Sequence, residues 1–507
     1  MASGGNVGGE TVRRSAVFSG AVQVAGTVFT ATLTLFLVRA LSPADFGRYS
    51  IVLAVGAIVL LPSDLGISVS ASRSIAEAFG DHARVRNVLA VAVRLKLVLA
   101  FVSGAAVTLL APVIADAYDD HGLVVPLRIM GAAIAAHALF AFTSAAYTAL
   151  RQMGAVLRIV TLESFVETGS AVALVLAGAG VGGAIAGRAL GYGIGAAVGL
   201  AMLAGRHGGV RALARERFDR GLARRLALYA GAVAVVDIIW AILSQVDVLI
   251  IGALLSTTAV AAFQAPSRLL SLATYPGLAL SYALGPRLAR GRREDTMVGT
   301  LATTARTLLV VQAFAAACTV VFTPWIVAIA LGHDYRHTSA ESVLRCLAPY
   351  VALSGLAPLF SNAIDYVGGA RRRIWIAAVT LVVNVALNFI LLPLVGPTGA
   401  AVALDVGYAF FVGGHVVLSR QLLGVDLGPL ASTAARVGVA GLLMAGIGVG
   451  IAALVDGDPG IVLGGLVGIA AFAAVVGTSP ADRALVAGAV RAPFSRRTAQ
   501  GGAPGRR

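Results

Sequence analysis

The chain has 507 residues, of which 58% are hydrophobic and only 12% are charged, and its mean hydropathy is +0.89. Soluble globular proteins carry about 25% charged residues, so this composition excludes that class and indicates a polytopic membrane protein. The net charge of +15 does not indicate nucleic-acid binding, because the basic residues are almost all arginines placed between apolar runs, and Lys96 is the only lysine. That distribution is typical of membrane topology.

Several sequence features that would indicate enzymatic or metal chemistry are missing. The two cysteines, Cys318 and Cys346, lie in apolar segments without CxxC spacing, so neither a disulfide framework nor a metal site is predicted. There is also no Walker sequence and no HExxH motif, so no cofactor is expected. The apolar run that follows Arg13 and Arg14 extends to about Val38, which is too long for a signal-peptide core and predicts a first membrane span.

A bilayer core of about 30 Å requires about 20 apolar residues per helix, and this length predicts about fourteen spans. The expected spans are 15–38, 48–72, 88–112, 125–150, 156–177, 182–204, 226–252, 259–286, 297–322, 342–366, 373–395, 398–419, 432–454 and 460–478. Successive loops alternate between arginine-rich and neutral or acidic. We therefore expect an all-α, multi-pass protein with both termini in the cytoplasm. The bias toward Ala, Gly and Arg with a single Lys points to a bacterial source, and so to the bacterial cytoplasmic membrane.

An internal repeat divides the chain at its most basic polar stretch, 206–225. The turn GVGGAIAGRALGY begins at Gly180, and GPTGAAVALDVGY begins 216 positions later (396 − 180) at Gly396. Two further pairs of segments recur at nearly the same offset. The repeat predicts two six-helix lobes of the same orientation. The expected organisation is an N-terminal lobe (1–205), a basic cytoplasmic linker (206–225), a C-terminal lobe (226–420), two extra helices (421–480) and a basic cytoplasmic tail (481–507).

Glycines recur at every fourth position in the sixth expected span. Gly187, Gly191, Gly195 and Gly199 would all lie on one helix face. Faces of small residues let helix backbones approach closely in lipid, so we expect this face to contact a neighbouring helix.

Charged residues inside spans are the candidates for function, because a charge in the bilayer is costly unless it faces a cavity or a partner. The acidic candidates are Asp64, Glu163, Glu167, Asp237, Asp247 and Asp405, and the basic ones are Arg94, Lys96, Arg188, Arg268 and Arg306. The arginines could bind a phosphate through the bidentate guanidinium fork, or they could snorkel or neutralise buried acids. The acids could couple transport to a proton or cation gradient, or they could form interhelical ion pairs, and both interpretations stay open.

The segment from Thr32 to Glu77 carries the motifs of a known superfamily. Arg39, the turn with Phe46 and Gly47, and Asp64-Leu65-Gly66 resemble the first two spans of the polysaccharide-transport branch of the multidrug/oligosaccharidyl-lipid/polysaccharide exporter superfamily. The segment 244–256, with Asp247 and Gly252, is similar to the seventh span of this branch of Wzx-like flippases. Ala261, Ala262 and Phe263 depart from the family pattern, which commonly has a Gly and a Tyr there.

The resemblance implies two lobes around a central cavity that opens alternately to the two faces of the membrane. The implied cargo is a polyprenyl-diphosphate-linked oligosaccharide, and no enzymatic activity is implied. Arg188, Arg268, Arg306 and Arg94 are the candidates for binding its head group. Glu163, Glu167 and Asp237 are the first candidates for ion coupling, followed by Asp247 and Asp64. The expected partners are membrane lipids, a polysaccharide polymerase and glycosyltransferases, with no nucleic acid.

Three other functions remain open from the sequence. A multidrug exporter or a lipid II flippase of the same superfamily would share the architecture. A membrane glycosyltransferase or polymerase is the candidate from a different class. It would need a substantial outer loop with catalytic acids, whereas the outer loops are short and the adjacent acids Asp119 and Asp120 are the only candidate.

Overall fold

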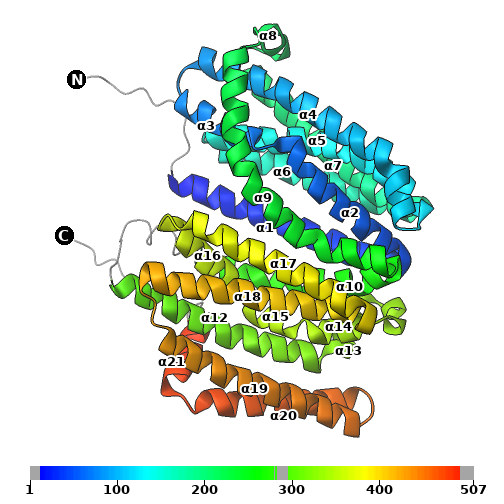
Figure 1. The fold of residues 1–507 in the computed structure, drawn as a ribbon, viewed down its shortest axis with the longest axis vertical. Helices are drawn as coiled ribbons and strands as arrows, with labels where there is room; N and C mark the ends of the chain where they lie inside the picture. Colours follow the sequence, from blue (N-terminus) through cyan, green and yellow to red (C-terminus); the bar gives the residue numbers. More distant parts are fainter. Residues whose placement is uncertain (1–11, 279, 282–294, 492–507) are drawn as a thin grey trace, which may run out of the picture. The chain divides into compact units, whose positions relative to one another are not determined.

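The computed structural model describes residues 12–278, 280–281 and 295–491, and all regular elements within these ranges are helices (Figure 1). The fold is therefore all-α, as the sequence predicts. The contacts between Cα atoms divide the chain into two compact units, Met1–Ala261 and Ala262–Arg507.

The first unit is a helical bundle whose last helix is α9. Its helices are α1 (Val12–Ala40), α2 (Pro43–Asp64), α3 (Ile67–Glu77), α4 (His82–Ala117), α5 (Val124–Ala149), α6 (Met153–Leu174), α7 (Gly180–Arg206), α8 (Val210–Arg215) and α9 (Arg220–Leu254). Helix α9, which begins within the basic stretch, packs on α2, α3 and α4 of the same unit. The division of the chain at 206–225 stays a prediction.

The break between α2 and α3 lies at the sequence Asp64-Leu65-Gly66. Leu65 has φ 44° and Gly66 has φ 74°, so both residues adopt the left-handed conformation that ends α2 and starts α3 in a new direction. Glycine adopts this conformation without steric cost, whereas leucine does not. At the other end of α2, Ser42 caps the helix by accepting from the N–H of Asp45.

Helices α6 and α7 form a hairpin whose two helices are in close contact. The chain reverses at Gly178 (φ 87°) and Gly180 (φ 50°). The glycine face predicted for 187–199 lies against its neighbours, because a Cβ added at Gly187 would lie 2.5 Å from the Cα of Ala171 on α6. The predicted contact face is therefore confirmed for this helix, and van der Waals packing in lipid is the physical reason for it.

The second unit contains the remaining helices. These are most of α10 (Thr257–Leu270), α12 (Asp295–Val321), α13 (Thr323–Ile326), α14 (Ala340–Cys346), α15 (Ala348–Ser354), α16 (Leu356–Tyr366), α17 (Ala370–Val395), α18 (Pro397–Leu423), α19 (Leu427–Leu454), α20 (Asp458–Gly477) and α21 (Pro480–Arg491). Helices α19 and α20 are the two additional ones, and they form a hairpin that contacts α12. The tail expected from 481 begins as part of α21, and 492–507 lie outside the described residues.

The repeat seen in the sequence is also present in the packing of each unit. In the α6–α7 hairpin a Cβ on Gly191 would lie 2.7 Å from the Cβ of Glu167, and in the α17–α18 hairpin a Cβ on Gly407 would lie 3.3 Å from the Cβ of Asn384. Gly407 follows Gly191 by 216 positions (407 − 191), the same offset as the repeated turns. The same helix pair thus recurs in both halves of the chain.

Ten helical stretches within the described residues are long and apolar enough to cross a membrane, or eleven if the bent pair Ala340–Cys346 and Ala348–Asp365 forms one span. One of the ten, Met153–Arg206, contains both α6 and α7. The count of fourteen is not confirmed. Part of the expected span 259–286 lies outside the described residues, which limits the count there.

Candidate functional site

Two acids and one arginine meet inside the first unit. Glu163 and Glu167 lie one turn apart on α6 and are only 5% and 8% exposed. Arg188 on α7 donates from Nε to Oε1 of Glu167 at 2.7 Å. This ion pair neutralises a carboxylate and a guanidinium, each of which would be costly in the bilayer without a partner.

The glycines of α7 bring these groups together. A Cβ on Gly191 would collide with the Cβ of Glu167, and one on Gly195 would lie 2.9 Å from the Cβ of Glu163. Both acids therefore leave α6 at the point where the two helices are closest. The sequence marked the acids and the glycines separately, and the structure places them in one contact.

The surroundings of Arg188 are aromatic. Its Cζ lies 5.8 Å from the ring centroid of Tyr192, and His137 on α5 meets the same ring edge-on at 4.7 Å. A pocket of about 70 Å³ adjoins these three residues and is lined on its other sides mainly by apolar side chains of α2 and α5, among them Leu53 and Met130. This volume holds a few water molecules at most.

Glu163 differs from Glu167 in its partner. The hydroxyl of Ser164 donates to Oε2 of Glu163 at 2.9 Å, and none of the described basic side chains forms an ion pair with it. A buried carboxylate with no ion pair among the described side chains is costly in the bilayer, which makes Glu163 a candidate for binding a proton or a small cation. The cluster thus combines a neutralised carboxylate, a second carboxyl group and a guanidinium.

The other predicted acids have different surroundings. Asp64 is paired with Lys96, whose side chain is fully buried. Asp247 lies on α9 and is 6% exposed. Asp237 also belongs to α9 but lies outside the residues whose side chains are described. Asp405 on α18 accepts the backbone N–H of Tyr350 at 2.9 Å.

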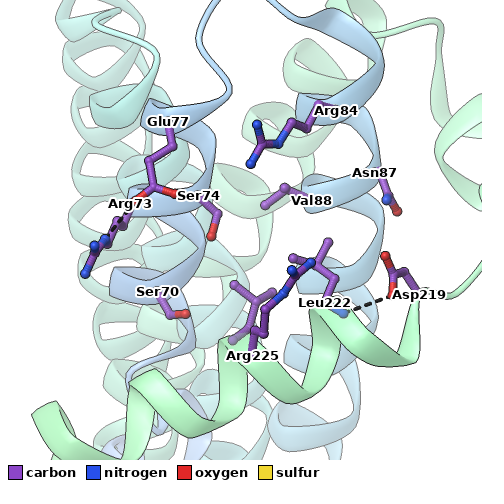
Figure 2. A pocket seen from close by; sticks show the side chains of 11 residues that line it. Ser70, Arg73, Ser74, Glu77, Arg84, Asn87, Val88, Asp219, Leu222 and Arg225 are labelled. Atoms are coloured by element: carbon purple, nitrogen blue, oxygen red, sulfur yellow. Dashed lines mark hydrogen bonds and ion pairs between the residues drawn. The ribbon is translucent and has the colours of Figure 1, made fainter.

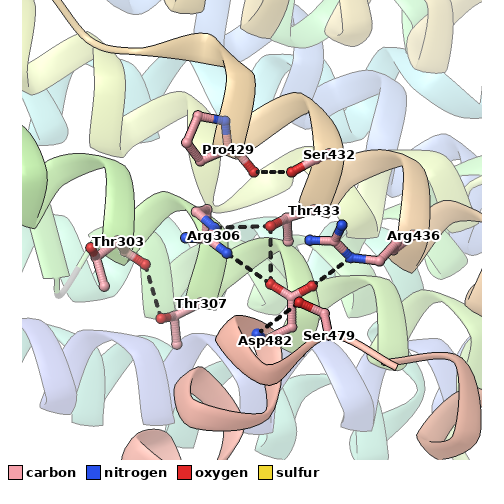
Figure 3. Close-up of polar contacts among 9 residues, drawn as sticks. All are labelled: Thr303, Arg306, Thr307, Pro429, Ser432, Thr433, Arg436, Ser479 and Asp482. Atoms are coloured by element: carbon pink, nitrogen blue, oxygen red, sulfur yellow. Dashed lines mark hydrogen bonds and ion pairs between the residues drawn. The ribbon is translucent and has the colours of Figure 1, made fainter. Parts of the chain in front are cut away.

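Two of the four predicted head-group arginines contact protein groups far away in the sequence. Nη2 of Arg94 donates to the carbonyl oxygens of Ala214 and Glu216 at 2.8 and 2.7 Å, and so holds the segment after α8. Arg306 on α12 donates to Asp482 at 3.0 Å and to Thr433 at 2.9 Å (Figure 3). Arg268 lies half-buried on α10.

Asp482 is a buried ion-pair residue that the sequence did not indicate. Its carboxylate is fully buried and accepts from Arg306, Thr433 and Arg436, so α21 is joined to α12 and α19 (Figure 3). Burial alone would raise the pKa of Asp482, but the hydrogen bonds from Arg436, Thr433 and Arg306 outweigh this effect and hold its pKa below the ordinary value. The distribution of charges along the sequence does not point to Asp482, because this residue lies in a segment with the composition of a polar tail.

No group of three or more His, Cys, Asp and Glu side chains within the described residues is arranged to hold a metal ion.

Comparison with known proteins identifies the family. The model of a family described as "Polysaccharide biosynthesis protein" matches residues 12–330, which is more than half of the chain. The chain belongs to this family. No curated protein sequence is detectably similar to the chain.

Solved structures are similar to the chain in fold. A structure described as "Lipid II flippase MurJ, inward closed conformation" shares 12% identity, with a TM-score of 0.69, over 90% of this chain and 97% of its own. A multidrug resistance MATE family transporter in its inward-facing conformation shares 15% identity, with a TM-score of 0.61, over 78% of this chain and 94% of its own. The chain is thus a multi-pass membrane protein of the polysaccharide biosynthesis family that shares the fold of these two structures.

Proposed function

We propose that the chain translocates a polyprenyl-diphosphate-linked oligosaccharide across a bacterial cytoplasmic membrane for surface polysaccharide assembly, by alternating access. The observation that carries the proposal is Arg188, a guanidinium held inside the first unit by Glu167. Membership of the polysaccharide biosynthesis family and the transporter fold support it. The lipid tail of such a cargo would stay in the bilayer, and the diphosphate would need a cationic partner.

Arg188 and Arg268 are the arginines that we propose for the diphosphate. Arg94 and Arg306 are weaker candidates, because their guanidinium groups already bind linker carbonyls and Asp482. A diphosphate would compete with Glu167 for the guanidinium of Arg188. Release of this ion pair would free the guanidinium for the cargo, and this exchange offers a physical link between cargo binding and the acids of the cluster.

Glu163 and Glu167 are accordingly the residues that we propose for ion coupling, with Asp237 as a further candidate. Asp64 and Asp247 remain candidates of lower rank. Asp64 ranks lower because its ion pair with Lys96 gives it a structural role.

Deletion of the gene followed by complementation tests this proposal. Loss of one surface polymer, with its lipid-linked precursor accumulating on the cytoplasmic side, is the expected phenotype of the deletion. Wild type and the control Arg158→Gln should restore the polymer. Arg188→Ala should restore less than about a tenth of it, because one charge-assisted bidentate interaction is worth roughly 1.5–3 kcal/mol. Arg188→Lys should also fail, because lysine lacks the planar fork.

The outcomes separate the alternatives. Full restoration by normally expressed Arg188→Ala would refute the head-group role. Accumulation of lipid II with loss of viability would indicate a lipid II flippase. Unchanged lipid-linked pools together with drug sensitivity would indicate a multidrug exporter. Altered chain length of a labelled lipid-linked precursor in purified membranes would indicate a glycosyltransferase or polymerase.

The proposed location places both termini and the 206–225 segment in the cytoplasm, following the distribution of arginines between loops. A polysaccharide polymerase and glycosyltransferases are the proposed protein partners. Cysteine labelling from either side of the membrane tests the orientation, and co-purification tests the partners.

A further inference from the structure

A second polar site lies in the first unit, away from the Glu163–Glu167–Arg188 cluster. It is a pocket of about 370 Å³ bordered by α3, by the first turns of α4 and by the first turns of α9 (Figure 2). None of the three cluster residues lines it. The pocket therefore needs an explanation of its own.

The charges that line the pocket are not balanced. Arg73 and Glu77 form an ion pair on α3 at 2.9 Å. Asp219 caps α9 by accepting the N–H of Leu222 at 2.9 Å. Arg84 on α4 and Arg225 on α9 have no ion pair with any of the described side chains, and both are exposed. Three arginines thus face two acids, and the two arginines without an acid come from different helices.

These two arginines line the same pocket from different helices. Arg84 enters it from α4 and Arg225 from α9, and Ser70 and Ser74 border it from α3 (Figure 2). Ser70 and Ser74 are four positions apart and so share a helix face. Helices α4 and α9 both begin beside the pocket, and the carboxylates of Asp81 and Asp219 already cap their N-termini. The two guanidinium groups and the two hydroxyls therefore make the anion site.

The geometry points to a binding pocket for a phosphate-bearing group, contacted by Arg84 and Arg225 and by the hydroxyls of Ser70 and Ser74. The ligand is a soluble phosphate or diphosphate, or the head group of an anionic lipid, since both present the same oxygens to a guanidinium. The inference does not depend on the proposed translocation, because the pocket shares no residue with the cluster around Arg188.

Binding to the purified full-length protein in phosphatidylcholine nanodiscs tests the pocket. One arm titrates sodium diphosphate by calorimetry. The other arm replaces part of the lipid by phosphatidic acid and counts retained lipids by native mass spectrometry. The variants are Arg84→Gln and Arg225→Gln. Arg224→Gln is the matched control, since it removes the same charge from an exposed neighbour on α9 that does not line the pocket.

We expect saturable binding in one arm, weakened about tenfold or more by each pocket variant and by less than twofold in Arg224→Gln. Binding of diphosphate in neutral nanodiscs identifies a soluble ligand, and binding of phosphatidic acid alone identifies a lipid head group. Either result supports the pocket. Absence of saturable binding in both arms, or equal weakening by Arg224→Gln and Arg225→Gln, would overturn it. Transport by the pocket variants is measured separately, so that a failure of the translocation proposal can be told apart from a failure of the pocket proposal.

Discussion

Nζ of Lys96 on α4 lies 2.5 Å from Oδ1 of Asp64 at the end of α2. The hydroxyl and the N–H of Ser68 donate to the same carboxylate oxygen at 2.6 and 3.2 Å. This contact lies next to the left-handed residues Leu65 and Gly66, where α2 ends and α3 begins. The ion pair of the only lysine in the chain therefore stabilises the break between α2 and α3, which contains the sequence Asp64-Leu65-Gly66.

We expect the two partners of this ion pair to respond unequally to substitution. The side chain of Lys96 is 0% exposed and that of Asp64 is 33% exposed. Asp64→Asn leaves a fully buried ammonium without its carboxylate, whereas Lys96→Met leaves the partly exposed Asp64 with its hydrogen bonds from Ser68. Asp64→Asn should therefore lower the free energy of unfolding by about 3 kcal/mol or more, and Lys96→Met by about 1–2 kcal/mol.

Thermal unfolding in detergent measures both variants and the double variant Asp64→Asn/Lys96→Met. The double variant should be more stable than Asp64→Asn, because it removes the unpaired charge. Equal losses from the two single substitutions would contradict the asymmetry in burial.

The contact between α6 and α7 predicts a sharp difference between two glycines of one helix. A Cβ at Gly187 would meet the backbone of Ala171, whereas nothing lies within 4 Å of a Cβ at Gly193. Gly187→Ala should therefore cost about 1–3 kcal/mol of unfolding free energy, because the helices would have to separate. Gly193→Ala, which gains helix propensity without a collision, should be neutral or slightly stabilising in the same unfolding measurement.

The ion pairs of Asp482 predict a pH dependence. Its pKa is below the ordinary value because three donors outweigh the effect of burial. The stabilisation is fully present above the unfolded-state pKa of about 4 and is lost as the pH falls through the lower folded-state pKa. Hydrogen exchange of the backbone in α21 should accelerate in this acidic range. In Asp482→Asn the exchange should already be fast at neutral pH and should no longer depend on this titration.

Arg94 predicts protection of the basic stretch 206–225. Its guanidinium holds the carbonyls of Ala214 and Glu216, and Arg86 pairs with the side chain of Glu216 at 3.0 Å. Arg94→Gln should release this segment, because hydrogen bonds to charged groups contribute roughly 1.5–3 kcal/mol. Trypsin should then cleave within 206–225 about tenfold faster. The same rate in Arg94→Gln and in the surface control Arg158→Gln would show that these bonds do not restrain the segment.

Much of the fold follows from the sequence, for a physical reason. The bilayer forces each crossing segment to be helical and apolar over about 20 residues, so composition and periodicity are enough to predict an all-α membrane protein. The repeat at 216 positions and the glycines at 187–199 are local patterns, and the structure confirms the helix pairs that they predict. The position of Glu163 and Glu167 inside an expected span makes them candidates for function, and the structure adds that both are buried.

The partners of the charged residues were decided by the tertiary structure. Sequence showed that Arg94, Arg188 and Arg306 lie in spans, but nothing local distinguishes an arginine that binds a carbonyl from one that faces an acid. Asp482 contacts Arg306 across 176 positions of the chain, and it lies in a segment that reads as a tail. Such a pair forms only when helix packing brings two distant segments together, because an ion pair depends on distances of a few ångströms in space and not on spacing along the chain.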